Sequence, residues 1–344
     1  MKSIHRFSIV IMILCLLFIL GCDSDKKPSA QAEIKPQNIK ICSTLGKNIT
    51  ELLVKDFVKQ SKIKIIPTIE YVPGGTLEQR LAYIEKGNFD CWLGGTAEEY
   101  YTANSHKLLA PYTSKEAFKV PLELRNRRNL WTSLYLSHIA IISNKTKLRN
   151  LGLYAPTTWA ELLDPNLKDQ IVIPNFNLGG SSFGMLTSIW QLRGKEAALV
   201  YAGKLNQQQP LYVNSPIEAA DAVYKGEKTL AIFDVGYALE LEEKHSHLFA
   251  TVPKDANRNL ITGVALLNNA KNEESAQLFI DYLMSNASEA LLHNNHYNYL
   301  WHVKEYPNNS GRTELVGKLN FPMDDLAWTS TYKSEIIRQW TEAK

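Results

Sequence analysis

Residues 89–99, FDCWLGGTAEE, join a short apolar run to the start of a helix. The run 89–93 has the length of a buried strand. Thr96 and Glu99 have the spacing of a capping box, in which each side chain bonds the backbone N–H of the other residue. A strand that turns almost at once into a helix is the repeating unit of a parallel sheet with crossover helices. The stretch therefore predicts an α/β fold.

The same alternation continues on both sides of this stretch. Further strands are predicted at 39–42, 63–69, 138–143, 171–174 and 229–234, with another apolar segment at 263–267. Helices are predicted from Asn48, from a second capping box at Thr76, from 156, from the loop 177–182 to about 192, from Ser215, and over most of 272–344. Because the pattern restarts after 143, we expect two α/β lobes, with 39–143 and 264–344 in lobe 1 and 144–263 in lobe 2.

The beginning of the chain has the pattern of a bacterial lipoprotein signal. Lys2 and Arg6 form a basic region, and the apolar stretch 7–20 that follows is too short to span a membrane comfortably. Gly21 is small enough to let a peptidase reach the bond before Cys22. An uncleaved membrane anchor is the alternative, and both interpretations place the folded part outside the cytoplasm.

We interpret 1–22 as a signal peptide and the polar segment 23–38 as a tether. The mature protein would begin at Cys22, which would carry lipid such as palmitate. We expect it to be anchored to the outer face of the cytoplasmic membrane, which is the periplasmic face in a Gram-negative cell.

The composition indicates a globular protein with little net charge. The chain has 38 Lys and Arg residues against 35 Asp and Glu, and the signal removes two basic residues and no acidic one. This balance gives no reason to expect binding to nucleic acid. About 300 residues follow the tether, which is enough for two lobes. We expect a monomer without a cofactor.

Two cysteines, Cys42 and Cys91, remain in the folded part when Cys15 and Cys22 are assigned to the signal. They could form a disulfide in an oxidising compartment, although directly neighbouring strands seldom have the geometry for it. Two buried free thiols are the other interpretation.

Short loops rich in Gly, Ser or Thr follow the predicted strands and precede the predicted helices. They are 43–47, 74–76, 94–96, 179–182 and 214–215. In an open α/β sheet such loops gather beyond the carboxyl ends of the strands, where ligands bind. Helix N-termini offer unpaired N–H groups and a positive dipole end, so several together would select an oxyanion. The alternative is that each side chain only caps its own helix.

Several stretches of the chain resemble bacterial extracellular solute-binding proteins, in the group that includes the periplasmic ferric-iron-binding proteins. The stretches are 90–96 (DCWLGGT), 108–112 (LLAPY), 156–165 (PTTWAELLDP), 171–174 (IVIP), 179–183 (GGSSF), 203–205, 214–215, 226–227, Pro253, Gly263 and 276–280 (AQLFI). Their order and spacing resemble the family over nearly all of the chain after the tether. The resemblance implies a two-lobed Venus-flytrap fold that closes on a solute and delivers it to an ABC-type permease.

Iron binders of this family have two adjacent tyrosines after the strand that corresponds to 230–234, often with a His near the first strand. This chain has Gly236 beside Tyr237 and no His in the loop 43–47. Ferric iron needs several anionic oxygen ligands, so it is the alternative ligand. The loop 94–96 looks like that of relatives that bind phosphorylated sugars or other organophosphates. We therefore expect a small anionic solute, with a phosphate ester first.

The predicted ligand-binding residues lie in the loops between strands and helices. They are Ser43, Thr44, Gly75, Thr76, Gly95, Thr96, Gly180, Ser181, Ser182, Ser215, Asp234 and Tyr237. Asp234 would accept hydrogen bonds from ligand hydroxyl groups and would not bind the anion. Lys47 and Arg80 are candidates to neutralise the anion, although a solvated surface charge is the commoner fate of such residues. Trp92 is a candidate to touch the ligand.

Two other functions fit parts of the pattern. The segment 180–184 matches the G-x-S-x-G motif of serine hydrolases, with Ser182 as nucleophile and Asp234 and His245 following in the chain order of a triad. Several residues separate this motif from the preceding strand, so we expect a binding protein and not an enzyme. A solute sensor for a membrane histidine kinase would need the same closing cleft as a transport protein.

Two histidine pairs could form metal sites. His245 and His247 lie near acidic residues, and His293 and His296 have helical spacing. Neither pair has Cys or carboxylate companions at metal-ligand spacing, so we expect no metal site.

Overall fold

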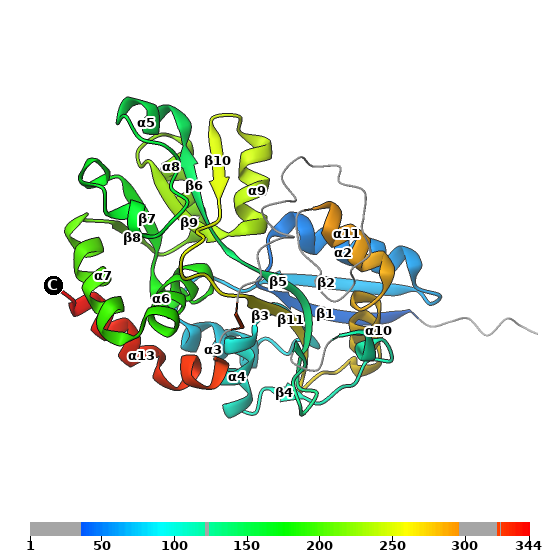
Figure 1. Ribbon diagram of the computed structural model, residues 1–344. Helices are drawn as coiled ribbons and strands as arrows, with labels where there is room; N and C mark the ends of the chain where they lie inside the picture. Colours follow the sequence, from blue (N-terminus) through cyan, green and yellow to red (C-terminus); the bar gives the residue numbers. More distant parts are fainter. Residues whose placement is uncertain (1–35, 121–123, 296–321, 324) are drawn as a thin grey trace, which may run out of the picture. The chain divides into compact units, whose positions relative to one another are not determined.

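The computed structural model describes residues 36–120, 124–295, 322–323 and 325–344 (Figure 1). The predicted signal peptide with Cys15 and Cys22, and the predicted tether up to 35, lie outside the described residues. Residues Gln37–Lys344 form one compact unit. Among the described residues, no helix is both long enough and apolar enough to cross a membrane.

The first sheet mixes parallel and antiparallel strands in the order β2-β1-β3-β11-β4, with β5 also paired to β11. Its strands are β1 (Gln37–Ser43), β2 (Ile65–Tyr71), β3 (Cys91–Thr96), β4 (Leu109–Ala110), β5 (Thr132–Ser137) and β11 (Leu260–Leu267). The helices that belong to it are α2 (Lys47–Gln60), α3 (Leu77–Lys86), α4 (Ala97–Ser105), α10 (Glu273–Leu283) and α11 (Asn286–Asn294), with a short 3₁₀ turn, η1 (Ala117–Lys119). Strands β1, β2 and β3 run parallel, as the strand–helix alternation predicts.

The second sheet has the order β10-β6-β9-β7-β8. Its strands are β6 (Ile139–Asn144), β7 (Ile171–Pro174), β8 (Leu211–Val213), β9 (Leu230–Asp234) and β10 (Leu248–Thr251). The helical segments are α5 (Lys145–Asn150), α6 (Gly180–Arg193), α7 (Lys195–Gln207), α8 (Pro216–Tyr224) and α9 (Val235–Lys244), and the 3₁₀ turns are η3 (Ala160–Leu163), η4 (Pro165–Leu167) and η5 (Phe176–Leu178). The helix predicted from 156 is therefore a pair of short 3₁₀ turns.

Both faces of the second sheet are buried, and β6 shows how. Successive side chains of a strand point to opposite faces, so Ile139 and Ile141 enter one apolar cluster while Ala140 and Ile142 enter another. A strand buried on both faces is apolar throughout, as β6 is. The first sheet and its helices share a separate apolar cluster.

The chain crosses between the two sheets through β5 and β6, which are separated only by His138. It returns through 252–259, between β10 and β11. Residues 138–143 were expected in lobe 1, but β6 pairs with β9 and β10 in the second sheet. Lobe 2 was expected to end at 263, whereas β11 enters the first sheet at Leu260. A uniformly apolar strand fits either sheet, and only its hydrogen-bond partners decide.

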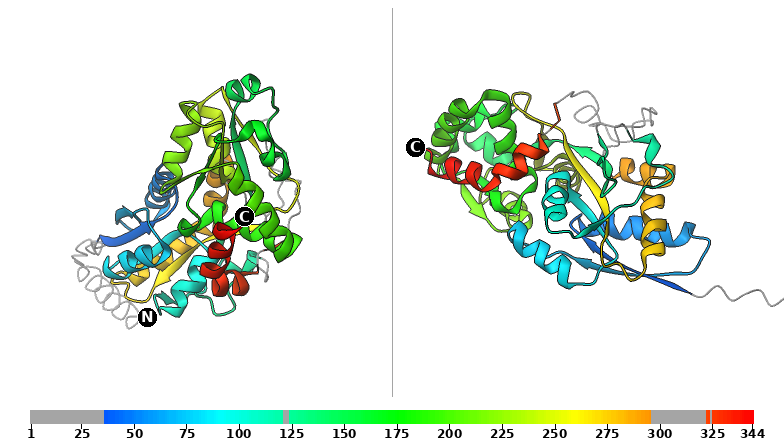
Figure 2. Two further views of the ribbon diagram at one scale, coloured as in Figure 1. Left: turned by 90° about the vertical axis from the view of Figure 1, so that its left-hand side faces the viewer. Right: turned by 90° about the horizontal axis from the view of Figure 1, so that it is seen from below.

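The last helix, α13 (Leu326–Glu342), lies against elements of both sheets (Figures 1 and 2). Its C-terminal half contributes Ile336, Ile337 and Trp340 to an apolar cluster of the second sheet. Lys333, one turn earlier, forms an ion pair of 2.8 Å with Glu98 of α4. The helix was expected to belong to the first lobe alone, but its apolar side packs on the second sheet.

The two described cysteines are free thiols. Cys42 and Cys91 are fully buried, and Cys42 Sγ donates to the backbone oxygen of Cys91 at 3.4 Å. Burial raises the pKa of both thiols, so they stay protonated at neutral pH.

Candidate functional site

Loops that follow strands of the two sheets face one another. A Cβ atom placed on Gly74, before α3, would lie 3.5 Å from the backbone oxygen of Asn214, before α8. Arg80 Nη2, on α3, donates to Leu178 O, before α6, at 2.8 Å. We call the loops 74–76, 94–96, 178–182 and 214–215 the facing loops. Most of the predicted ligand-binding residues lie in them.

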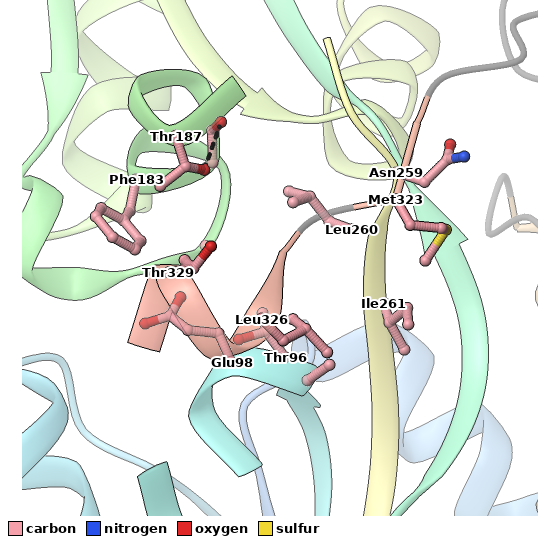
Figure 3. Close-up of a pocket in the computed structure, with 13 residues that line it drawn as sticks. Thr96, Glu98, Phe183, Thr187, Asn259, Leu260, Ile261, Met323, Leu326 and Thr329 are labelled. Carbon is pink, nitrogen blue, oxygen red and sulfur yellow. Dashed lines mark hydrogen bonds between the residues drawn. The ribbon is translucent and has the colours of Figure 1, made fainter. Parts of the chain in front are cut away.

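A small cavity lies between the two sheets beside these loops (Figure 3). Its lining comes from α4 and the end of β3, from α6, from β11 and from the start of α13, namely Thr96, Ala97, Glu98, Gly180, Phe183, Gly184, Thr187, Asn259, Leu260, Ile261, Met323, Leu326 and Thr329. Its volume of about 20 Å³ has room for one water molecule. The structure thus brings two predicted residues from different sheets, Thr96 and Gly180, to one space.

The side chain of Trp92 makes a hydrogen bond to the loop after β1. This side chain is fully buried, and its Nε1 donates to Thr44 Oγ1 at 3.2 Å. Ser43 Oγ is buried and bonded to Thr50 Oγ1 at 2.9 Å. Trp92 is therefore a core residue that fixes Thr44, and it offers no face to a ligand. Lys47 is exposed beside this loop, as expected of a solvated charge.

Three predicted hydroxyl groups cap helices. The side chains of Thr76, Thr96 and Ser215 each accept a hydrogen bond from the backbone of the helix they begin. Accepting leaves the hydroxyl hydrogen available, so a capping side chain can still donate to an anion. Ser182 differs, because its buried Oγ donates to Gly179 O at 3.2 Å within its own turn. The side chain of Ser181 makes no hydrogen bond with any described residue.

The glycine loop before α4 is built around Tyr100. The Tyr100 hydroxyl accepts from Gly95 N at 3.0 Å and lies 2.9 Å from the backbone oxygen of Gly263 on β11. A Cβ atom on Gly95 would lie 2.7 Å from the Tyr100 ring, which is closer than such atoms approach. Gly95 thus allows the ring to hold the loop and does not itself indicate ligand binding.

Helix α6 begins without a capping side chain. Its N-cap, Gly179, has φ +76°, the following Gly180 has φ +61°, and no acidic residue lies in the first turn. Left-handed backbone at two successive positions requires glycine or a strained residue. The unpaired N–H groups and the positive dipole end of α6 thus carry no compensating charge from their own helix.

Arg80 is less exposed than its sequence context suggests. Its side chain is only 12% exposed, and it forms an ion pair with Glu99 of α4. A Cβ atom placed on Gly179 would lie 3.6 Å from Arg80 Nη2 and 3.4 Å from Lys333 Nζ. Glu99 Oε1 would lie at 3.6 Å from the same atom, so two cationic groups and one carboxylate lie beside the start of α6. The glycines of the loop 177–182 led to the expectation of an anion site, but no sequence pattern links this loop to α3.

Asp234 begins α9 and ties it to the end of β5. Its Oδ1 accepts from Gly236 N at 2.8 Å and from Tyr237 N at 3.4 Å, and the Ser137 hydroxyl donates to its Oδ2. Burial raises its pKa to about 6, although the two backbone hydrogen bonds pull the pKa down. The expected role of Asp234, accepting from ligand hydroxyls, stays a prediction, because Ser137 occupies one of its acceptor positions.

The raised pKa of Asp234 predicts how stability depends on pH. A carboxyl group whose folded-state pKa exceeds its unfolded value binds more protons in the folded state, so stability falls as pH rises from about 4 to 6. Asn at this position can keep the cap and has no charge. Relative to wild type, Asp234→Asn should therefore gain about 3 kcal/mol in free energy of unfolding between pH 4 and 7. Urea unfolding of both proteins at four pH values measures this difference, and a constant difference would contradict it.

Tyr237 lies in the first turn of α9, three residues after Asp234, and is partly buried. Its ring centroid is 5.2 Å from that of Phe233. Burial, with the negative charges of Glu240 and Asp221, raises the pKa of the phenol. Ionisation to a tyrosinate is therefore disfavoured here. Within the described residues, no group of three His, Cys, Asp or Glu side chains could hold a metal ion.

The residues of the hydrolase motif make other contacts. Ser182 is bonded within α6, Asp234 is bonded to Ser137 and to α9, and the His245 ring lies 4.3 Å from that of Tyr224. A nucleophile must reach its base by a hydrogen bond, and no such bond joins these three described residues.

The sequence is similar to a known protein family and to several known proteins. Residues 100–313 match the family described as bacterial extracellular solute-binding protein. An uncharacterised protein of Haemophilus influenzae is 27% identical over 271 residues, covering 76% of this chain and 77% of its own. Iron uptake protein A1 of Synechocystis is 24% identical over 289 residues, covering 80% and 79%.

Two solved structures are similar over most of their length. The periplasmic binding protein P5PA superposes with a TM-score of 0.76 at 25% identity, covering 90% of this chain and all of that one. The periplasmic binding protein AfuA from Actinobacillus pleuropneumoniae, solved with fructose 6-phosphate bound, has a TM-score of 0.75 at 24% identity, covering 90% and 98%. The two sheets correspond to the two lobes of such proteins. Because the family match spans more than half of the chain and the fold agrees, this protein belongs to the bacterial extracellular solute-binding proteins, the solute-capturing components of ABC importers.

Proposed function

We propose that the protein captures a small phosphate ester between its lobes and delivers it to an ABC permease. The observation that carries this proposal is the start of α6, where an uncapped helix N-terminus faces Arg80 of the other lobe. Helix N-termini and arginine are the two groups that proteins use most readily to hold phosphate. The likeness to AfuA, solved with fructose 6-phosphate, supports the same class of ligand.

The geometry supplies donors from both lobes. Thr96 and Arg80 come from the first lobe, and Ser181 with the backbone of Gly180 comes from the second. An anion that bonds both sets would favour the closed arrangement, because it gains contacts only when the lobes meet. The organic part of the ligand would lie toward Asp234, whose carboxylate would accept hydrogen bonds from ligand hydroxyl groups.

Ferric iron is the second candidate ligand, because Iron uptake protein A1 is a relative. The chain offers Tyr237 as an anionic oxygen ligand, but its neighbour is Gly236 and its own pKa is raised. Hard ferric iron would therefore lack the set of anionic ligands that it needs among the described residues. A phosphate ester would need only hydrogen-bond donors such as those of Arg80 and of the start of α6.

The family is extracellular, and we further propose that a lipid on Cys22 anchors this member to the membrane. The segment after Cys22 would let the lobes reach a permease in the same membrane. We propose that the protein works as a monomer and by binding alone, without catalysis. A role as sensor for a histidine kinase would use the same site, and the neighbouring genes distinguish it from transport.

Thermal unfolding of the chain without residues 1–22 tests the ligand class. Fructose 6-phosphate, 3-phosphoglycerate, citrate and ferric citrate are added separately. A ligand at a hundred times its dissociation constant stabilises the folded state by about 2.7 kcal/mol, so a phosphate ester that binds should raise the melting temperature clearly. The proposal fails if neither ester has this effect. A rise with ferric citrate alone, with a coloured complex, would establish iron instead.

A further inference from the structure

We propose that Arg80 senses the charge of the bound anion, and that Glu99 holds its guanidinium in position. The inference rests on the proposed function, since it concerns how a phosphate group would be recognised. It gives a ligand-binding role to the ion pair of Arg80 with Glu99.

The position of Arg80 is fixed by two contacts from different lobes. Its Nη2 donates to Glu99 of α4 and to Leu178 O of the second lobe. Glu99 is itself immobilised, because its Oε2 accepts from Thr96 N at 2.9 Å in the capping box of α4. The carboxylate is only 3% exposed. Arg80 is thus held by a rigid helix start and not by a flexible surface acid.

Three of the five N–H groups of Arg80 have no hydrogen-bond partner among the described residues. A guanidinium has five N–H groups, and the two on Nη2 are used by Glu99 and Leu178. Neither Nε nor Nη1 has a hydrogen-bond partner among the described residues, and Nε is buried. An acceptor that approaches Nη1 would therefore bind without first displacing a protein partner.

The charges around Arg80 favour an anion with more than one negative charge. Lys333 is paired with Glu98 and Arg80 with Glu99, so these four side chains are balanced. The positive end of α6 is additional, and it lies beside both cations and beside the Glu99 carboxylate that balances Arg80. The start of α6 and the free edge of Arg80 together form a positively charged corner, which attracts a phosphate dianion more strongly than a monoanion.

A purely structural role for Arg80 makes a different prediction. If Arg80 only joins the lobes through Leu178 O, its loss weakens closure and lowers the affinity for every ligand by the same factor. If Arg80 contacts the anion, its loss removes discrimination between dianion and monoanion. Fructose 6-phosphate and fructose 6-sulfate separate these cases, because the two esters have similar shape and differ in charge.

The experiment measures the affinity of both esters by titration calorimetry, at pH 7.5, for wild type and Arg80→Met. We expect the wild type to prefer the phosphate by about tenfold, and Arg80→Met to lose about 10- to 100-fold in phosphate affinity and most of the preference. Lys225→Met, which removes an exposed cation of the second lobe paired with Asp221, should change neither affinity.

A second variant shows whether an effect of Arg80→Met arises from misfolding. Arg80→Met leaves Glu99 buried without its partner, so Arg80→Met/Glu99→Gln is measured beside it. Gln keeps the cap, as Gln79 does for Thr76 in α3. The double variant should show the same loss of preference. An unchanged preference, or an equal loss for both esters, overturns the inference and leaves the proposed function standing. If the wild type binds neither fructose 6-phosphate nor 3-phosphoglycerate, the proposed function fails and this inference with it.

Discussion

Replacement of Asp90 by alanine is expected to lower the free energy of unfolding by about 3 to 5 kcal/mol. Asp90 is fully buried just before β3. Its carboxylate accepts from Lys40 N at 2.7 Å, from Lys271 N and Asn272 N at 2.8 Å each, and from Asn272 Nδ2 at 2.9 Å. Alanine would leave three backbone N–H groups without this acceptor, and each such group costs about 1 to 3 kcal/mol when buried.

Urea unfolding followed by tryptophan fluorescence measures the loss. Asp164→Ala is the matched control, because Asp164 accepts a single backbone hydrogen bond, from Asn166 N at 2.8 Å, in a partly exposed turn. We expect it to cost about 1 kcal/mol or less. If the two alanine variants lose the same free energy of unfolding, the hydrogen bonds of Asp90 do not stabilise the fold more than the single bond of Asp164 does.

Trp340→Ala should be almost as destabilising, at about 3 to 5 kcal/mol. The side chain is fully buried, and its ring centroid lies 6.1 Å from that of Phe176 and 5.9 Å from that of Tyr201. The cavity left by alanine would open under η5, the turn that leads to Gly179. The variant should therefore also weaken binding of the phosphate ester at temperatures where it is still folded.

Trp340→Phe separates packing from the indole N–H. Trp340 Nε1 is buried without a hydrogen-bond partner among the described residues, so phenylalanine removes an unpaired donor and keeps most of the apolar contact. We expect a loss below about 2 kcal/mol. Chemical unfolding of both variants gives the comparison, and a phenylalanine variant as unstable as the alanine variant would contradict the packing argument.

Local signals in the sequence were sufficient for much of the fold. The capping boxes at Thr76 and Thr96 and the start of α8 at Ser215 lie where they were predicted, because a helix start depends on side chains within four residues of each other. Strands were harder. Strands β4, β5, β8 and β10 were missed, and β6 was assigned to the wrong sheet, because pairing depends on residues far away in the sequence.

In the candidate site, too, local features were predicted and long-range contacts were not. The loops were predictable, since each follows a strand and precedes a helix. The roles of individual side chains were not, as Trp92 and Arg80 illustrate. Trp92 lies next to the glycine loop in the sequence, yet it points into the core. Arg80 looks like a surface charge on an amphipathic helix, and only the approach of α4 and of the second lobe buries it.

The link between β5 and β6 leaves the chain no freedom in length. Ser137 ends one ladder, Ile139 begins the other, and the residue between them is fully buried. One inserted residue would shift one of the two registers and exchange the side chains that pack on the two buried faces of that strand. Descendants of this chain can therefore vary in their surface loops, but insertions and deletions at His138 should be absent from any that still fold. Deep mutational libraries would show the position as one where substitutions are sometimes tolerated and length changes never are.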